Sequence, residues 1–285
     1  MKFHLAHIVP NPRMHGLNGY KDVIDTVAWG LQAFGHDVTY ALNAVSHTAI
    51  NIIFGAQVMS VDDLNSLGAN TIIYHLEQIR GYAPDVLRPQ SHVCAQRFQI
   101  WDYSKFNIET WASLGPKRPV KIVPVSFAPV LQRIGKQDPQ DIDVLIYGIT
   151  GTERLLAFHA LSNAGYSTVF VSGLYGSARD DLIARSKIVL NVTLYQQSRI
   201  FEVVRVSYLL ANSKAVVALA GPDLGIEDDL DRAVRFCHPD HLLATVEELL
   251  NDERERQKLE LAGHDFIRTK DIRLPLQQAL ADIMA

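Results

Sequence analysis

The chain has 285 residues, of which 48% are hydrophobic and 20% charged, and its formal net charge is −4. This is an ordinary globular composition with room for one large domain or two ordinary ones, and it carries no general electrostatic footprint for nucleic acid or a membrane surface. The two cysteines, Cys94 and Cys237, fit no zinc or redox spacing, and no run reaches the roughly 18 apolar residues of a membrane span, so we expect a cytoplasmic protein without disulfides.

Short β-branched runs alternate with amphipathic stretches along nearly the whole chain, which is typical of parallel sheets with crossover helices. In the first half, the predicted strands are Phe3–Val9, Asp37–Tyr40, Ile50–Phe54, Thr71–His75, Phe98–Trp101 and Lys121–Pro124. The predicted helices of this half are Gly19–Phe34, Val61–Leu67 and Lys105–Ser113.

A second series of the same kind begins near residue 142. Its predicted strands are Val144–Tyr147, Ser167–Val171, Ile188–Val192, Ala215–Ala218 and Val234–Phe236. Its predicted helices are Thr152–Ala164, Ala178–Arg185, Phe201–Asn212, Pro239–Asn251, Glu253–Thr269 and Pro275–Met284.

The pattern therefore predicts an α/β protein made of two Rossmann-like domains that face each other across a cleft. Residues 1–125 form the first domain, the Pro- and Gly-containing residues 126–140 a linker, and residues 141–270 the second domain. Residues 271–285 form a C-terminal helix that can pack back on the first domain. Open parallel sheets bind ligands beyond the carboxyl ends of their strands, so we look for functional residues in the loops that follow strands.

Two glycine-bearing loops of the second domain have the character of a nucleotide site. Gly148 and Gly151 lie in a strand-to-helix turn, where free N–H groups and the helix dipole favour phosphate, and Arg154 adds a full positive charge. Gly173 and Tyr175 follow the next strand, where the backbone can approach a flat ligand and the ring can stack on a base. A tight turn and a flexible loop are the plain alternatives.

The segment that follows the strand near residue 190 has the strongest signal. Ser198 can cap a helix that starts at Phe201, and Glu202 lies in its first turn, where a carboxylate can accept both hydroxyls of a ribose. Arg199 lies just before the helix and can face a phosphate. The alternative is that Glu202 only compensates the helix dipole and that Arg199 and Arg205 are solvated.

The segment SRIFEVVRVSYLLANSKAVVAL resembles the donor-site helix and following strand of glycosyltransferases with the GT-B fold. It is most similar to the bacterial and viral branch with a group-1-like glycosyl transferase domain. The tracts SGLYGSARDDLIARSKIVLNV, HLEQI and WDYSKFNIE share this likeness, which covers most of the chain.

The resemblance implies that Glu202 grips the donor ribose, that Arg199 lies near the diphosphate and that Gly173–Tyr175 form the base-binding loop. It also implies transfer without a metal, and we expect no cofactor. Many retaining members carry a second Glu seven or eight residues before the ribose Glu, but Tyr195 and Leu194 occupy those positions here. This departure leaves the stereochemistry open.

The first half should hold the acceptor. Three residues after strands are candidate general bases: His15 in a glycine-containing loop, Glu77 and Asp102. Each has a structural alternative as a loop residue, an ion-pair partner or a local cap.

The resulting hypothesis is a glycosyltransferase that moves a sugar from a UDP- or GDP-linked donor to a hydroxyl of a glycan, lipid-linked sugar, small molecule or modified nucleobase. Gly148, Gly151, Arg154, Gly173, Tyr175, Ser198, Arg199, Phe201 and Glu202 are its predicted donor-site residues. An NAD-dependent oxidoreductase is one alternative, although the loop PNPRMHGLNG after the first strand lacks the GxGxxG pattern. A non-catalytic nucleotide- or sugar-binding protein is another.

Overall fold

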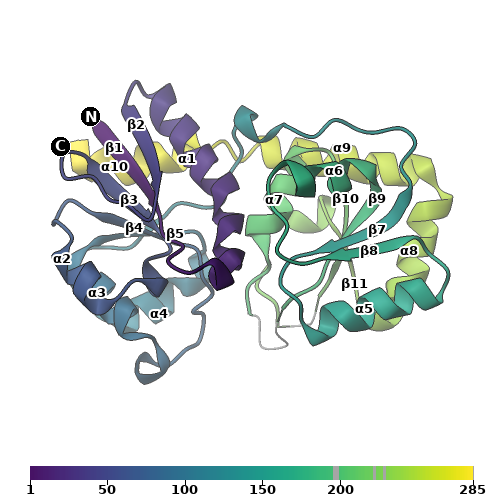
Figure 1. Ribbon diagram of the computed structural model, residues 1–285, viewed down its shortest axis with the longest axis horizontal. Helices are drawn as coiled ribbons and strands as arrows, with labels where there is room; N and C mark the ends of the chain where they lie inside the picture. The colour runs from purple at the N-terminus through teal and green to yellow at the C-terminus, as the bar shows by residue number, and fades with distance from the viewer. Residues whose placement is uncertain (195–198, 221–222, 227–228, 285) are drawn as a thin grey trace. The chain divides into compact units, whose positions relative to one another are not determined.

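The computed structural model describes residues 1–194, 199–220, 223–226 and 229–284. The chain divides into two compact units (Figure 1). Unit 1 contains Met1–Ala128 and the chain from Asp271 on, and unit 2 is Pro129–Lys270. Each unit is built on a parallel sheet with helices, which confirms the predicted α/β class.

Unit 1 has a six-stranded sheet in the order β2-β1-β3-β4-β5-β6. Its strands are β1 (Lys2–His7), β2 (Asp37–Leu42), β3 (Ile50–Phe54), β4 (Ile72–His75), β5 (Gln99–Asp102) and β6 (Lys121–Ile122). Its helices are α1 (Lys21–Ala33), α2 (Val61–Ser66), α3 (Pro89–Arg97), α4 (Ile108–Ser113) and α10 (Arg273–Met284). All the strands predicted for this half are present, with ends that agree or are shifted by one or two residues.

Helix α3 was not predicted from the sequence. Pro89 occupies its first turn, where the fixed φ angle and the missing N–H suit a helix start. Its buried positions are the small side chains Ser91, Cys94 and Ala95. Because this face carries no large apolar residues, the segment lacks the hydrophobic period by which a helix is normally predicted.

Helix α10 packs on α1 within unit 1. Leu276 is fully buried, and a Cβ added at Gly30 of α1 would lie only 2.5 Å from the Leu276 Cδ1 atom. The Arg273 guanidinium lies over the Trp29 ring at 5.5 Å, and Phe127 pairs with Asp271 in a parallel bridge. The close approach at Gly30 lets the C-terminal helix complete the core of this unit.

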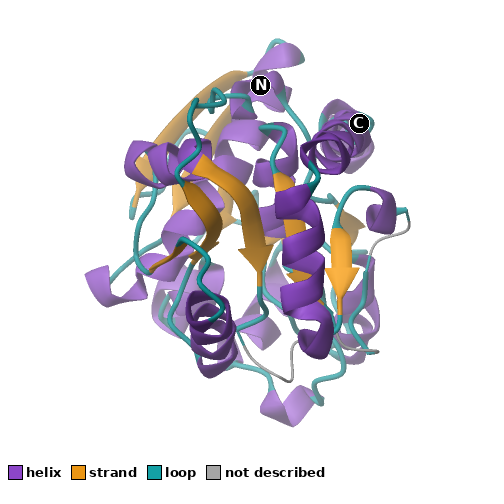
Figure 2. Ribbon diagram, turned by 90° about the vertical axis from the view of Figure 1, so that its right-hand side faces the viewer, coloured by secondary structure: helices purple, strands orange, loops and turns teal. Residues whose placement is uncertain are grey.

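Unit 2 has a five-stranded sheet in the order β11-β10-β9-β7-β8, whose strands run side by side in one direction (Figure 2). The strands are β7 (Ile142–Tyr147), β8 (Thr168–Val171), β9 (Ser186–Asn191), β10 (Ala215–Leu219) and β11 (Arg235–Cys237). The helices are α5 (Thr152–Asn163), α6 (Ser177–Arg185), α7 (Val203–Ala211), α8 (Leu242–Asn251) and α9 (Glu253–Arg268).

The chain order reverses between the neighbouring strands β7 and β9. Leu161 of α5 joins the core cluster that contains Ile146 and Leu190 on one face of the sheet. The next residues along these strands, Tyr147 and Asn191, lie on the other face, where both contact Arg205 of α7. Helices α5 and α6 accordingly cover opposite sides of this sheet (Figure 1). Such a switch point is where open parallel sheets bind ligands at their carboxyl edge.

None of the helices in the described part of the chain is both long and apolar enough to cross a membrane.

Candidate functional site

The turn between β7 and α5 is shaped by two glycines. Gly148 has φ +130°, and a Cβ there would lie 2.7 Å from Nη2 of Arg205 and 2.8 Å from Nη1 of Arg154. Gly151 is the extended N-cap residue of α5, so no side chain caps the first amides of that helix. A Cβ on Gly151 would lie 2.9 Å from Cδ1 of Leu194. The glycines therefore let the loops after β7 and β9 meet, and they leave helix amides open to an anion.

Arg154 lies inside this turn and not at its surface. Its side chain is 1% exposed, with Nε donating to the Val192 carbonyl at 2.9 Å and Nη1 to the Ile149 carbonyl at 2.7 Å. Nη2 donates to both carboxylate oxygens of Glu202, at 2.9 and 3.1 Å. Burial, followed by the like charge of Arg205, lowers the pKa of Arg154 to about 10. The prediction that Arg154 binds a diphosphate is corrected here, because its donors are taken up within the protein and it positions Glu202 instead.

Glu202 is the N-cap residue of α7, which begins at Val203 and not at Phe201 as predicted. Its carboxylate accepts from Arg154 and, at 2.7 Å, from Nη1 of Arg205 one turn further along the helix. The side chain keeps 16% of its surface exposed. A carboxylate has about four lone-pair positions, so these contacts leave capacity for a ligand hydroxyl.

Arg205 completes the cluster, although it was considered above only as a solvated residue. Nη1 also donates to Oδ1 of Asn191 at 3.1 Å, and the guanidinium lies over the Tyr147 ring at 5.3 Å. Asn191 is fully buried, and its Nδ2 atom has no hydrogen-bond partner in the part of the chain that the structure describes. The spacing of Glu202 and Arg205, three residues apart on a helix, was the available signal.

The loop after β8 reaches the same cluster. Burial raises the pKa of Tyr175, and the charges of Arg205, Arg179 and Arg154 oppose this rise, so the phenol lies near these arginines. Gly173 adopts a left-handed φ of +74° in the same loop. The Tyr175 phenol therefore lies within electrostatic range of Arg154 and Arg205, the two arginines that contact Glu202.

The three remaining predicted donor-site residues are Ser198, Arg199 and Phe201. Ser198 lies outside the described residues, as does Tyr195 in the position of the second Glu. Arg199 is exposed, and its carbonyl accepts from the Gly225 amide at 2.9 Å. Phe201 is buried in the core of unit 2, with its ring 5.2 Å from that of Phe236. The Phe201 side chain therefore packs in the core next to the start of α7 and is not available to a ligand.

The candidate bases lie in or near the carboxyl edge of the unit 1 sheet. Glu77 is half-buried and accepts from the Tyr20 hydroxyl and, at 3.0 Å, from Nε2 of Gln57. His15 is half-buried in a 3-10 segment, Pro12–Tyr20, that follows β1. Asp102 ends β5 and has no exposed surface. As a direct base Asp102 is corrected, because a fully buried carboxylate cannot contact an acceptor hydroxyl.

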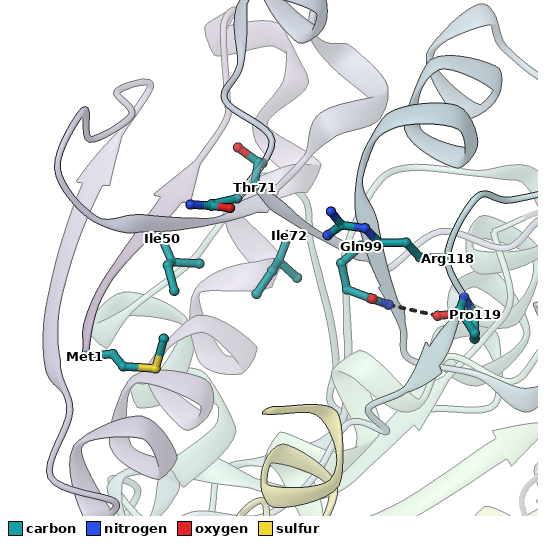
Figure 3. Close-up of a pocket in the computed structure, with 8 residues that line it drawn as sticks. Met1, Ile50, Thr71, Ile72, Gln99, Arg118 and Pro119 are labelled. Carbon is teal, nitrogen blue, oxygen red and sulfur yellow. Dashed lines mark hydrogen bonds between the residues drawn. The ribbon is translucent and has the colours of Figure 1, made fainter. Parts of the chain in front are cut away.

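A cavity of about 480 Å³ in unit 1 has a different character (Figure 3). Ile50, Ile72 and Gln99 line it, and these residues begin β3, β4 and β5. Gln99 is tied to the Pro119 carbonyl at 2.9 Å. The cavity therefore lies at the amino edge of the sheet, opposite the edge where parallel sheets bind ligands. Among the described residues, no three His, Cys, Asp or Glu side chains are grouped so that they could hold a metal ion.

The chain thus has two α/β units, and in unit 2 a charged cluster lies at the switch point of the sheet, where open parallel sheets bind ligands. No family model matches the chain, and no curated protein sequence matches it. Solved structures do match over its whole length. HepE from Anabaena, in complex with UDP and glucose, has a TM-score of 0.61 at 10% identity and covers 100% of both chains. The HepE complex with UDP-glucose gives 0.60 at 11%, covering 100% of this chain and 99% of its own.

Two further structures agree. Sucrose-phosphate synthase from Thermosynechococcus elongatus has a TM-score of 0.59 at 10% identity, covering 100% of this chain and 99% of its own. A glycosyltransferase from Rickettsia africae also gives 0.59, at 11% identity and 99% coverage of each chain. The chain therefore has the fold of GT-B glycosyltransferases, as the sequence resemblance implied. No subfamily is placed.

Proposed function

We propose that the protein is a glycosyltransferase that moves a sugar from a nucleoside diphosphate sugar to an acceptor hydroxyl. The observation that carries the proposal is the Glu202 carboxylate, which two arginines hold at the start of α7 and beside the Gly148 turn. The full-length likeness to glycosyltransferase structures supports it.

Each part of the cluster has a role in this proposal. Glu202 accepts the ribose hydroxyls, and the Tyr175 ring packs on the base. Arg205 and the uncapped first amides of α5 face the diphosphate, where positive charge and aligned N–H groups stabilise the negative charge that develops on the leaving group. These groups supply that stabilisation without a metal. Arg154 acts through Glu202.

Uridine is the base that we propose for the donor, because HepE was solved with UDP and with UDP-glucose. Guanosine stays the second candidate. The acceptor is a hydroxyl of a glycan, a lipid-linked sugar, a small molecule or a modified nucleobase, and unit 1 binds it.

A thermal-shift screen with UDP, GDP, ADP and NAD tests the donor class. A ligand at 100 times its Kd stabilises its protein by about 2.7 kcal/mol, which a melting curve resolves. We expect a shift with UDP. A shift with NAD alone would favour the oxidoreductase alternative and reject the proposal.

Glu202→Gln tests the ribose assignment, because it keeps the side-chain shape and removes the charge. A hydrogen bond to a charged group contributes about 1.5–3 kcal/mol, so the affinity for UDP should fall roughly tenfold or more. Glu248→Gln is the matched control, because Glu248 also pairs with an arginine, Arg235, at 3.1 Å on the surface of unit 2. Equal UDP affinity in wild type and Glu202→Gln would reject the assignment.

Release of UDP from UDP-glucose separates an enzyme from a binding protein. A transferase transfers the sugar of some donor molecules to water and so releases UDP, whereas a non-catalytic binding protein leaves the donor intact.

A further inference from the structure

The cavity at the amino edge of the unit 1 sheet has an apolar floor with one polar side chain in it. Ile72 and Gln99 are direct partners in the register of β4 and β5, and Ile52 of β3 pairs with Ile72. Ile50 lies two residues before Ile52, so its side chain projects from the same face of the sheet. The volume of about 480 Å³ lies in the range of about 300–1,000 Å³ that is typical of small-molecule sites.

The Gln99 amide is held so that its oxygen is left to the cavity. Nε2 donates to the Pro119 carbonyl at 2.9 Å and to the Ile100 carbonyl at 3.1 Å. Because a carbonyl can pair only with the nitrogen, these two contacts fix the orientation of the amide. Gln99 is buried, and among the described residues none donates to its Oε1 atom. A buried amide oxygen without a donor is costly, so this atom calls for a donor from a ligand.

Arg118 adds a positive charge to the lining of the cavity. The next residue, Pro119, is tied to β5 by the Gln99 amide, and the Arg118 side chain extends from this loop toward Ile72 (Figure 3). Within the described ranges of the chain, no hydrogen bond or ion pair involves its guanidinium. Arg97 at the end of α3 differs, because its Nη1 and Nη2 atoms donate to backbone carbonyls at 2.6 and 3.1 Å. The Arg118 donors are therefore left for a ligand.

The lining favours a carboxylate over a phosphate. The planar guanidinium fork matches the two oxygens of a carboxylate. Phosphate sites commonly use the free amides at a helix N-terminus, whereas none of the described lining residues begins a helix. The isoleucines of the floor can hold a branched or aromatic body, and the Gln99 oxygen can accept from a hydroxyl.

We propose that this cavity binds a small hydroxy acid with a branched or aromatic apolar body. The carboxylate pairs with Arg118, the hydroxyl donates to Oε1 of Gln99, and the body packs on Ile50 and Ile72. The site lies at the edge of the sheet opposite the one where parallel sheets bind their substrates, so the hydroxy acid is a second ligand and not a substrate of the transfer. The inference is independent of the proposed function, because the site is built from unit 1 alone.

Titration calorimetry of the full chain with three kinds of probe tests the ligand class. The hydroxy acids are 2-hydroxy-4-methylpentanoate and mandelate, their deoxy forms are 4-methylpentanoate and phenylacetate, and their neutral forms are the primary amides of the two hydroxy acids. We expect the hydroxy acids to bind about threefold more tightly than the deoxy acids and about tenfold or more tightly than the amides. Inorganic phosphate should bind more weakly than either hydroxy acid.

Three results of this titration would overturn the proposal. These are the absence of binding by both hydroxy acids, equal affinity for the acids and their amides, and tighter binding of phosphate. A failure of UDP to bind would leave the hydroxy-acid result unaffected, and the reverse also holds, so the two proposals fail separately.

Arg118→Gln tests the site itself. The substitution removes the charge and keeps a polar side chain, so the Kd of mandelate should rise about tenfold or more. Lys117→Gln is the matched control, because Lys117 is the exposed neighbour of Arg118 and is not among the lining residues. It should change the Kd by less than about twofold, since exposed charges are screened. Both positions are exposed, and equal melting temperatures would show that both variants are folded. An unchanged Kd in Arg118→Gln, or equal losses in the two variants, would reject the site.

Hydrogen–deuterium exchange with mandelate locates the ligand. Residues 68–72 and 116–121 should exchange more slowly in its presence, and residues 199–205 of unit 2 should not change. Protection of residues 199–205 without protection of the cavity peptides would contradict the assignment.

Discussion

At the scale of single residues, the proposed donor site depends on how two arginines share the carboxylate of Glu202. Arg154 is almost completely buried and makes hydrogen bonds to two carbonyls besides Glu202, whereas Arg205 keeps 18% of its side-chain surface exposed. A buried arginine whose three nitrogens all have protein partners supports the fold, and a partly exposed one is able to contact a ligand. The two arginines should therefore respond differently to substitution.

Replacing each arginine by methionine tests this division. Arg154→Met leaves buried carbonyls and part of a carboxylate unpaired, so the free energy of unfolding should fall by about 3 kcal/mol. Arg205→Met should cost only about 1 kcal/mol, because its ion pair is partly exposed. The UDP affinity of Arg205→Met should nevertheless fall at least as far as the UDP affinity of Arg154→Met. Urea denaturation and isothermal titration with UDP measure the two quantities, and equal losses of stability would contradict the division.

At the scale of elements, the turn from β7 into α5 brings two loops together only because it has glycines. Gly148 combines a left-handed φ with a Cβ position that Arg154 and Arg205 already fill. Gly165, beyond the other end of α5, has a φ of +91° but nothing within 4 Å of its Cβ position. Comparing substitutions at the two glycines therefore separates the effect of backbone strain, which both would have, from the effect of crowding, which only Gly148 would have.

Gly148→Ala and Gly165→Ala should both lose about 1 kcal/mol of stability from the unfavourable backbone angle. Only Gly148→Ala should lose UDP affinity, by about tenfold or more, because its methyl group displaces the two guanidinium groups. Melting curves with and without UDP measure both effects. A Gly148→Ala protein with wild-type UDP affinity would show that the turn does not shape the site.

At the scale of the whole molecule, the chain leaves unit 1 after Ala128 and returns to it at Asp271. Helix α10 thus completes the core of unit 1, although it follows unit 2 in sequence. Leu276 is fully buried in this helix, whereas Leu274 is 63% exposed. The stability of unit 1 should therefore depend on residues that lie more than a hundred positions away from the rest of it.

Leu276→Ala should lower the free energy of unfolding of unit 1 by about 3 kcal/mol, as buried leucine truncations do. Leu274→Ala should change it by less than about 0.5 kcal/mol. UDP should still stabilise unit 2 in both variants. Limited proteolysis in urea, with fragments assigned by mass spectrometry, follows the units separately. Equal effects of the two substitutions would contradict the packing of α10.

The sequence predicted the alternating elements because buried parallel strands and amphipathic helices have distinct periods. It also pointed to Glu202, Gly148 and Tyr175, because they follow strands, and their role in a donor site stays a prediction. The sequence did not predict Arg205 and Asn191 as part of the cluster. Their contact depends on β9 lying beside β7, and no local sequence pattern encodes strand order. The hydrogen bonds from Asn107 and Trp111 to the Asp102 carboxylate were also not predicted, because only folding brings these side chains together.

Hydrogen–deuterium exchange with and without UDP tests the central claim, that a nucleotide binds at the carboxyl edge of the unit 2 sheet. The peptides that follow β7 and β9, residues 148–154 and 199–205, should exchange more slowly when UDP is bound. Exchange at the amino-edge cavity of unit 1, near Ile72 and Gln99, should not change. Protection of that cavity, or of unit 1 peptides alone, would contradict the account.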